Sequence, residues 1–156
     1  MNIMVWNVQG LGNGRAFRTL INLKQYHNSY MMILFETKVS HVVMESVRVK
    51  LGFGGKLVVN NVWRSGGVGM LWNEGVSIDL ISYTQSQIDV KVISHGSMEW
   101  RLTGFYSHPD ESQRCHSWTL LKRLSELIEL PWLCVGDLNE ILCGSKKEGG
   151  LKRTQF

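Results

Sequence analysis

The chain has 156 residues, 44% of them hydrophobic and 19% charged, which is typical of one globular domain spanning residues 1–156. No apolar run approaches the ~18 residues of a membrane-spanning helix, and the first residues lack the basic segment and cleavage site of a secretory signal. These features exclude a transmembrane segment and predict an intracellular protein, nuclear or cytoplasmic.

The charge and the cysteines narrow the function classes only slightly. A net charge of +4 permits a polyanionic partner without requiring one. The densest basic stretch, Lys146–Arg153, is interpreted as a solvated surface segment. Three cysteines without Cys-x-x-Cys spacing indicate neither a disulfide framework nor a zinc site.

The first fifty residues predict two strand–helix units. Ile3–Val8 is a short apolar run followed by a glycine-rich loop, and apolar residues at helical spacing begin at Phe17. Met31–Phe35 is a second apolar run, and Val43, Val47 and Leu51 predict a helix after Ser40, although β-branched residues weaken that helix.

From residue 53 to residue 107 the hydrophobic period is two, which predicts a meander of consecutive strands. We expect a loop over residues 61–67 and a hairpin turn over residues 94–97. The expected strands are Lys56–Val59, Gly69–Trp72, Val76–Ile81, Ile88–Ile93 and Trp100–Tyr106. A helix carrying Trp118 to Ile128 should then end at Pro131. Together the elements predict an α/β sandwich of mixed sheets.

The last predicted strand, Trp132–Val135, is uninterruptedly apolar and should be buried on both faces. Asp137 and Asn139 follow it and can point the same way, an arrangement suited to a metal-bound phosphate; the alternative is a turn in which Asp and Asn bond their own backbone. Asn7 and Glu36 also follow apolar strands. Because strands that share a direction end at one rim, we expect these side chains to converge there.

A second motif suggests nucleotide binding but fails in detail. Gly10, Gly12 and Gly14 lie between a strand and a helix, and Glu36 ends the next strand, as in a dinucleotide-binding unit. The third glycine of that motif would fall at position 15, which is Arg15. No parallel crossovers follow, so we do not expect a dinucleotide cofactor.

The order of the motifs resembles the endonuclease/exonuclease/phosphatase superfamily, and within it the endonuclease domain of plant LINE-type (non-LTR) retroelements. The stretches that carry the resemblance are Trp6–Asn13, Phe35–Lys38, Gly66–Trp72, Thr103–Pro109, Pro131–Leu142 and Lys147–Gly150. The resemblance implies a DNase I-like α/β sandwich flanked by helices, and Mg²⁺- or Mn²⁺-dependent hydrolysis of a phosphodiester in DNA.

The resemblance also implies roles for individual residues. Glu36 would be the principal metal ligand and Asn7 an accessory one. Asp137 would orient the attacking water or the phosphate, Asn139 would bond a phosphate oxygen, and Tyr106 would lie near that phosphate. Mg²⁺ prefers oxygen ligands and usually takes one or two carboxylates, which agrees with this set. His108 is interpreted as part of a loop rather than as a base.

Members of the superfamily continue to a terminal Ser-Asp-His motif that supplies the general base, whereas this sequence ends at Phe156 and has no Asp-His pair. The resemblance therefore implies a domain truncated at its C-terminus, with weak or absent nuclease activity. Two alternatives stay open, a non-catalytic interaction or regulatory protein and a phosphoesterase acting on a small substrate. An uncovered strand edge and apolar face would favour self-association or a protein partner.

Overall fold

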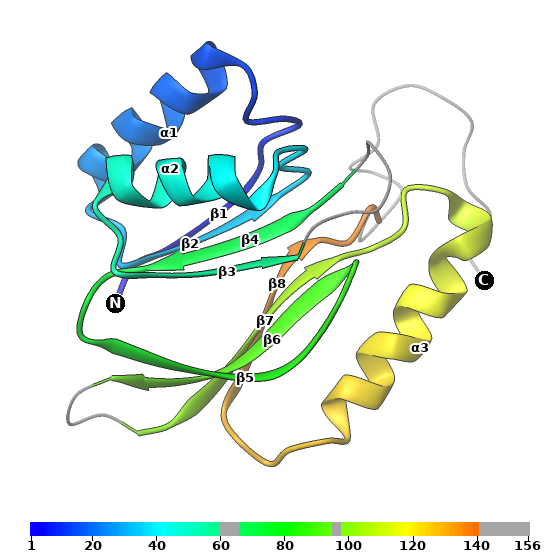
Figure 1. Cartoon of the computed structure of the whole chain (residues 1–156). Helices are drawn as coiled ribbons and strands as arrows, with labels where there is room; N and C mark the ends of the chain where they lie inside the picture. The colour runs from blue at the N-terminus through cyan, green and yellow to red at the C-terminus, as the bar shows by residue number, and fades with distance from the viewer. Residues whose placement is uncertain (60–65, 95–97, 141–156) are drawn as a thin grey trace.

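The structure is a computed structural model that describes residues 1–59, 66–94 and 98–140, and in this part of the chain two four-stranded sheets pack face to face (Figure 1). The first sheet has the strand order β1-β2-β4-β3 and the second β5-β6-β7-β8. The elements are β1 (Ile3–Asn7), α1 (Gly14–His27), β2 (Met31–Phe35), α2 (His41–Leu51), β3 (Gly55–Val59), β4 (Val68–Trp72), β5 (Val76–Thr84), β6 (Gln87–Ser94), β7 (Trp100–Tyr106), a 3₁₀ turn (Glu111–Gln113), α3 (Arg114–Ser125) and β8 (Trp132–Asp137).

Each sheet contains one parallel pair, β1 with β2 and β7 with β8, and the other neighbours are antiparallel. The mixed sandwich predicted from the sequence is therefore confirmed. The predicted meander is confirmed for β3–β4 and for β5–β6–β7 but is wrong between β4 and β5, because the turn over residues 73–75 sends the chain from the first sheet to the second. Period-two patterning reports that a strand has two faces, but not which sheet it joins.

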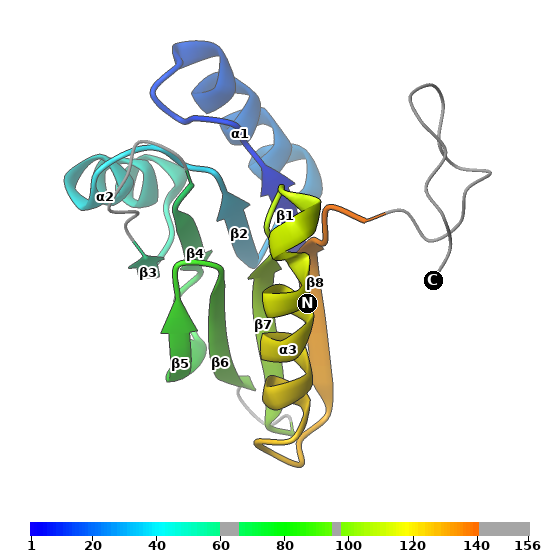
Figure 2. The same ribbon diagram turned by 90° about the vertical axis from the view of Figure 1, so that its right-hand side faces the viewer.

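Two apolar cores follow from the alternation of side chains along β2, all of whose residues are buried. Met32 and Leu34 face α1 and α2 on the outside of the first sheet, whereas Met31, Ile33 and Phe35 face the second sheet. The sheets approach closely at Gly104 of β7, where an added Cβ would lie 2.8 Å from the Ile33 Cγ2 atom. Figure 2 shows the two sheets with α3 beside β7 and β8.

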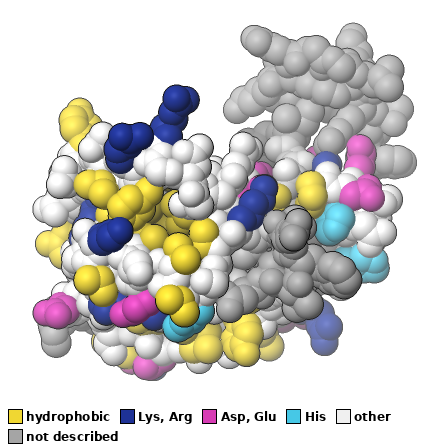
Figure 3. All heavy atoms as spheres, turned by 45° about the horizontal axis from the view of Figure 1, so that its top comes forward, with side chains coloured by type: hydrophobic (Ala, Val, Ile, Leu, Met, Phe, Trp, Pro, Cys, Tyr) yellow, Lys and Arg dark blue, Asp and Glu magenta, His cyan; other side chains and the backbone are white. Residues whose placement is uncertain are grey.

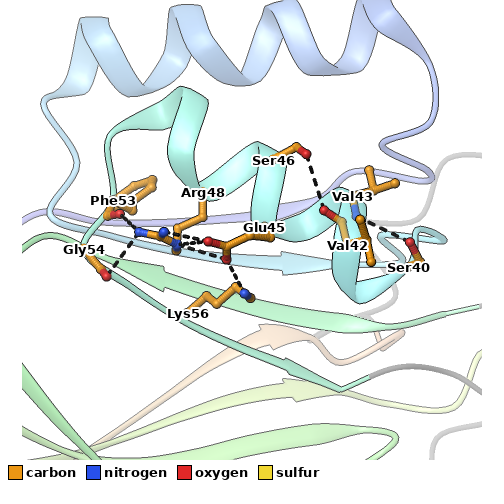
Figure 4. A network of polar contacts seen from close by, with 9 residues as sticks. All are labelled: Ser40, Val42, Val43, Glu45, Ser46, Arg48, Phe53, Gly54 and Lys56. Carbon is orange, nitrogen blue, oxygen red and sulfur yellow. Dashed lines mark hydrogen bonds and ion pairs between the residues drawn. The ribbon is translucent and has the colours of Figure 1, made fainter.

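The helix α2 begins after Ser40, as predicted, and the Ser40 hydroxyl accepts a hydrogen bond from the Val43 amide. The valines of α2 lower its intrinsic helix propensity, and tertiary contacts stabilise the helix instead. Arg48 bonds Glu45 and the carbonyls of Phe53 and Gly54, and Lys56 of β3 pairs with Glu45 (Figure 4). These two cations lower the pKa of Glu45 to about 2, with the Arg48 hydrogen bond as the main cause.

The surface over α1 and α2 mixes hydrophobic and cationic side chains (Figure 3). Val42, Val43 and Val49 of α2 are all exposed, with Val42 74% exposed. No helix within residues 1–59, 66–94 and 98–140 is long and apolar enough to span a membrane.

The helix α3 covers a buried polar network on the outer face of the second sheet. Arg101 and Asp89 are fully buried and form a bidentate salt bridge with hydrogen bonds of 2.9 and 2.8 Å. Thr103 donates to Asp89, and Trp132 donates to Thr103. The predicted helix up to Ile128 is wrong at its end, because α3 stops at Ser125 and the Leu124 carbonyl accepts a hydrogen bond from Arg101.

The strand β8 is not buried on both faces, contrary to the sequence prediction. It is an edge strand among the described residues, and Leu133 is 43% exposed. An apolar run marks a strand, but it does not show whether another layer covers each of its faces. Between β8 and α3 lies a groove of about 420 Å³, lined by Trp118, Leu121, Lys122, Ser125, Trp132 and Cys134.

Some sequence predictions lie outside the described residues. They are most of the loop over residues 61–67, the turn over residues 95–97, the basic stretch Lys146–Arg153 and the motif Lys147–Gly150.

Candidate active site

The candidate site lies where the two parallel pairs end. Asn7 is the last residue of β1, and Glu36 directly follows β2. Tyr106 and Asp137 are the last residues of β7 and β8 and lie opposite each other in the register of that pair. Because β1 and β8 lie against each other, the carboxyl ends of all four strands meet at one rim, which is where ligands bind in α/β folds.

The side chains at this rim form one hydrogen-bonded group. The Asn7 amide nitrogen donates to Glu36 Oε1 at 3.1 Å and to Asp137 Oδ2 at 3.2 Å. The Tyr106 hydroxyl donates to the same Glu36 oxygen at 2.7 Å. The structure thus brings Glu36 and Asp137 to one rim, as the strand ends predicted. The catalytic and ligand roles of these residues stay predictions.

Asn139 joins the group through its backbone and its side chain. Its amide N–H donates to Asp137 Oδ1 at 2.9 Å, which is the turn considered as the alternative for this pair. Its side-chain nitrogen donates to the Ser107 carbonyl at 2.7 Å. The turn and the site are therefore compatible, since the turn itself aims the Asp137 carboxylate. One of the two Asn139 side-chain N–H groups holds the neighbouring chain segment.

The loop after β2 has an unusual backbone. Glu36 and Lys38 adopt left-handed conformations with φ of 51° and 52°, and Asn139 does so with φ of 50°. Such conformations are uncommon outside glycine and gather at functional sites when surrounding bonds enforce them. Here Thr37 N–H and Lys38 N–H donate to the carbonyls of Gly67 and Gly66. This backbone pairing directs the Glu36 side chain into the rim.

Hydrogen bonds and burial oppose each other at Glu36, whereas burial and the contact with Glu36 act together on Tyr106. The Tyr106 hydrogen bond is the main reason that the pKa of Glu36 is lowered, and Asn7 and Lys38 add to this effect. Burial, reinforced by the negative charge of Glu36, raises the pKa of Tyr106 to about 12. At neutral pH the carboxyl group is therefore ionised, and the phenol keeps the proton that it donates.

The structure adds two residues to which the sequence analysis gave no role. Lys38 places its ammonium 3.3 Å from Glu36 Oε2. Ser107 is buried, and its hydroxyl oxygen has no hydrogen-bond partner within the described residues. Both lie inside motifs that the sequence analysis singled out, but only the tertiary structure shows what they face. His108 is exposed, and its Nδ1 atom accepts a hydrogen bond from the Asp110 N–H, which agrees with a loop role.

The donor set fits a hard divalent cation. No group of three or more histidine, cysteine or acidic side chains gathers at one place in the described residues. Two carboxylates share one amide at the rim, and Mg²⁺ is typically held by one or two carboxylates and water. The Asn7 Oδ1 atom accepts a hydrogen bond from the Gln9 N–H. The Asn7 side-chain nitrogen, rather than this oxygen, faces the two carboxylates, so a cation held between them would meet the oxygen only after the amide group rotates.

No family model and no curated protein matches the sequence. Solved structures do match. The human Nocturnin catalytic domain with bound sulfate aligns over 88% of this chain with a TM-score of 0.65 and 13% identity. TDP2 from Caenorhabditis elegans aligns over 89% with a TM-score of 0.67 and 18% identity. The endonuclease domain of TRAS1, a telomere-specific non-LTR retrotransposon, aligns over 90% with a TM-score of 0.63 and 17% identity.

The fold is DNase I-like. These neighbours share the endonuclease/exonuclease/phosphatase architecture, in agreement with the fold predicted from the motifs. The chain spans 64% of the Nocturnin domain, 47% of TDP2 and 61% of the TRAS1 domain. TM-scores of 0.63–0.67 establish a common fold, and identities of 13–18% do not transfer an activity.

Proposed function

We propose that this DNase I-like chain is a retroelement-type endonuclease domain that hydrolyses phosphodiesters in DNA with Mg²⁺ or Mn²⁺. The observation that carries the proposal is the rim at which Glu36 and Asp137 share the Asn7 amide and Tyr106 donates to Glu36. The retroelement assignment is supported by the order of the sequence motifs and by the TRAS1 endonuclease domain among the structural neighbours. The net charge of +4 agrees with a polyanionic substrate.

Each rim residue has a part in this chemistry. Glu36 would hold the cation, with Asn7 as an accessory ligand, and the cation would supply Lewis-acid stabilisation of charge on the phosphate. Asp137 orients the attacking water or the phosphate. Asn139 would hydrogen-bond a phosphate oxygen, and Tyr106, whose single O–H donates to Glu36, would lie close to that phosphate. The Tyr106 phenol is suited to donation because it keeps its proton up to a pKa of about 12.

We propose that turnover by this chain is weak or absent. The sequence has no Asp-His pair, and a positioned general base contributes about 10²–10⁴-fold to a hydrolytic rate. His108 does not replace it in the described geometry, because the Asp110 N–H already occupies its Nδ1 atom. Among the described residues, water activation would then rest on the rim carboxylates and the cation.

The test measures nicking of supercoiled plasmid and, separately, Mn²⁺ binding by calorimetry. We expect slow nicking and one cation site, both lost in Glu36→Ala. Glu99→Ala is the matched control, because Glu99 is an exposed carboxylate preceding the first residue of β7, at the opposite end of that strand from the rim. Nicking or cation binding that survives Glu36→Ala would contradict the proposal.

A non-catalytic role is the second candidate, and the outer edge of β8 favours it. Arg101 N–H donates to the Pro131 carbonyl and Ser107 N–H to the Asp137 carbonyl, so the odd-numbered residues of β8 bond to β7. The N–H and C=O groups of Trp132, Cys134 and Gly136 then point away from β7. Pro131–Gly136 carries no charged residue to discourage strand pairing. We propose that a second copy of this chain pairs along this edge.

A further inference from the structure

Arg114 fastens three chain segments beside the rim. Its guanidinium donates to Glu140 Oε1 at 2.6 Å, to the His108 carbonyl at 3.2 Å and to the Pro109 carbonyl at 2.9 Å. The side chain is only 8% exposed. Arg114 is the first residue of α3, so these bonds join the helix to the segment after β7 and to the segment after β8. Charged hydrogen bonds of this kind are about twice as strong as neutral ones.

The two segments that Arg114 joins are those that carry one half of the candidate site. Ser107 N–H donates to the Asp137 carbonyl at 2.8 Å, and the Asn139 side chain donates to the Ser107 carbonyl at 2.7 Å. Glu140 follows Asn139 directly, so its bond to Arg114 is a further link between the same two segments. The segment after β8 is thus held against the segment after β7 by the two Ser107 bonds and, one residue further along, by Arg114.

We infer that Arg114 and Glu140 form a positioning pair that aims Asp137 and Asn139 at the substrate. Glu140 directly follows Asn139, and the backbone of Asn139 is in a left-handed conformation. Such a backbone persists only where surrounding bonds enforce it, and the Arg114 contact is a charged bond placed to do so. Its catalytic meaning rests on the proposed nuclease function. The structural part of the inference does not.

Arg114 is not arranged as a DNA contact. All three of its guanidinium nitrogens donate within the protein, and little of the side chain is exposed. A phosphate contact would make DNA affinity more dependent on salt, whereas a positioning residue would leave that dependence unchanged. Loss of Arg114 should therefore reduce turnover without changing the salt dependence of DNA binding.

The chain contains a matched control. Arg48 also donates to one carboxylate, Glu45, and to two consecutive backbone carbonyls, those of Phe53 and Gly54 (Figure 4). This second arrangement ties α2 to the start of β3, whereas the candidate site lies at the ends of β1, β2, β7 and β8. Arg48→Gln thus removes the same kind of contact without touching the rim.

The experiment follows the side-chain amide signal of Asn139 by ¹H–¹⁵N NMR, with the signal assigned through its loss in Asn139→Asp. In Arg114→Gln we expect this signal to shift toward that of a free amide and its exchange with water to accelerate. In Arg48→Gln we expect no change. Nicking in Mn²⁺ should fall about 10–100-fold in Arg114→Gln, with unchanged salt dependence of DNA affinity.

Two further variants keep the test decisive. Glu140→Gln removes the charge from the more exposed partner, so it serves if Arg114→Gln does not fold. Exchange of the charges in Arg114→Glu with Glu140→Arg should restore part of the Asn139 signal. An Asn139 signal that is the same in Arg114→Gln, Glu140→Gln and Arg48→Gln would overturn the inference. Absence of Mn²⁺ binding by the unaltered protein would count against the nuclease proposal alone, because the NMR comparison still decides the positioning.

Discussion

Tyr106 and Glu36 are linked at the rim by the proton of the Tyr106 hydroxyl group. Burial beside a negative charge raises the pKa of the phenol, and the hydrogen bond from the phenol lowers the pKa of the carboxyl group. Asn7 adds a second donor to the same Glu36 oxygen. Glu36 is thus an ionised carboxylate whose orientation is fixed by hydrogen bonds from neighbouring side chains, as is usual for a cation ligand.

Removal of the Tyr106 hydroxyl should raise the pKa of Glu36. In Tyr106→Phe the ionised form loses its main hydrogen bond, so protonation occurs at higher pH. Tyr26→Phe is the control, since Tyr26 is 85% exposed. The measurement is a ¹³C NMR titration of the Glu36 carboxyl group in cation-free protein. The same titration midpoint in both variants and in the unaltered chain would show that the phenol does not set this pKa.

Residue-level predictions from the sequence succeeded where a strand end fixed the position. Asn7, Glu36 and Asp137 each follow an apolar run, and strand direction together with the packing of β1 against β8 brings them together. The same reasoning could not find Lys38 or the pair formed by Arg114 and Glu140. Their partners are set by how α3 and the loops pack, and a charged residue in a sequence carries no mark of its partner.

At the scale of elements, β8 depends on a close approach to β7. Gly136 lies opposite Phe105 in the parallel register, and an added Cβ would lie 1.7 Å from the Phe105 carbonyl oxygen. Its φ of 157° is also unfavourable for a side chain. The predicted strand ends at Val135, but Gly136 is itself a residue of β8, one position before Asp137.

Gly136→Ala should therefore displace the end of β8 from β7. We expect a loss of stability of about 1–3 kcal/mol from overpacking, together with loss of the hydrogen bond between Ser107 N–H and the Asp137 carbonyl. Gly14→Ala is the control, because a Cβ added at this glycine, at the start of α1, would meet nothing within 4 Å. Denaturant unfolding gives the stability, and amide hydrogen exchange at Ser107 reports the bond. Equal stability of the two variants would refute this account of Gly136.

Element boundaries were predictable where local chemistry sets them. Ser40 caps α2, and the apolar run Met31–Phe35 coincides with β2. The end of α3 was not predictable in this way, because Arg101, distant in sequence, bonds the Leu124 carbonyl. The second face of β8 was also mispredicted, since an apolar run does not show whether another layer covers each face of the strand.

For the whole molecule, the edge of β8 predicts association between copies. Outward backbone groups, the exposed Leu133 and the neighbouring apolar groove form one uncharged border, apart from Lys122. Light scattering over a concentration series should show dimers, and Leu133→Lys should shift the population toward monomer. Val42→Lys on α2 introduces the same charge at a site that is 74% exposed and should leave the dimer intact. A monomer at every concentration would contradict the self-association proposal.

The order of strands along the chain has a consequence for how the site comes into being. The first sheet is built entirely from residues 3–72 and the second from residues 76–137, and each supplies half of the rim. Asn7 and Asp137, which meet through one hydrogen bond, are separated by 130 positions. Contacts of such separation are entropically expensive to close and form slowly. Neither sheet alone contains both carboxylates, so the site exists only in molecules whose two halves have docked, and its assembly marks completion of folding.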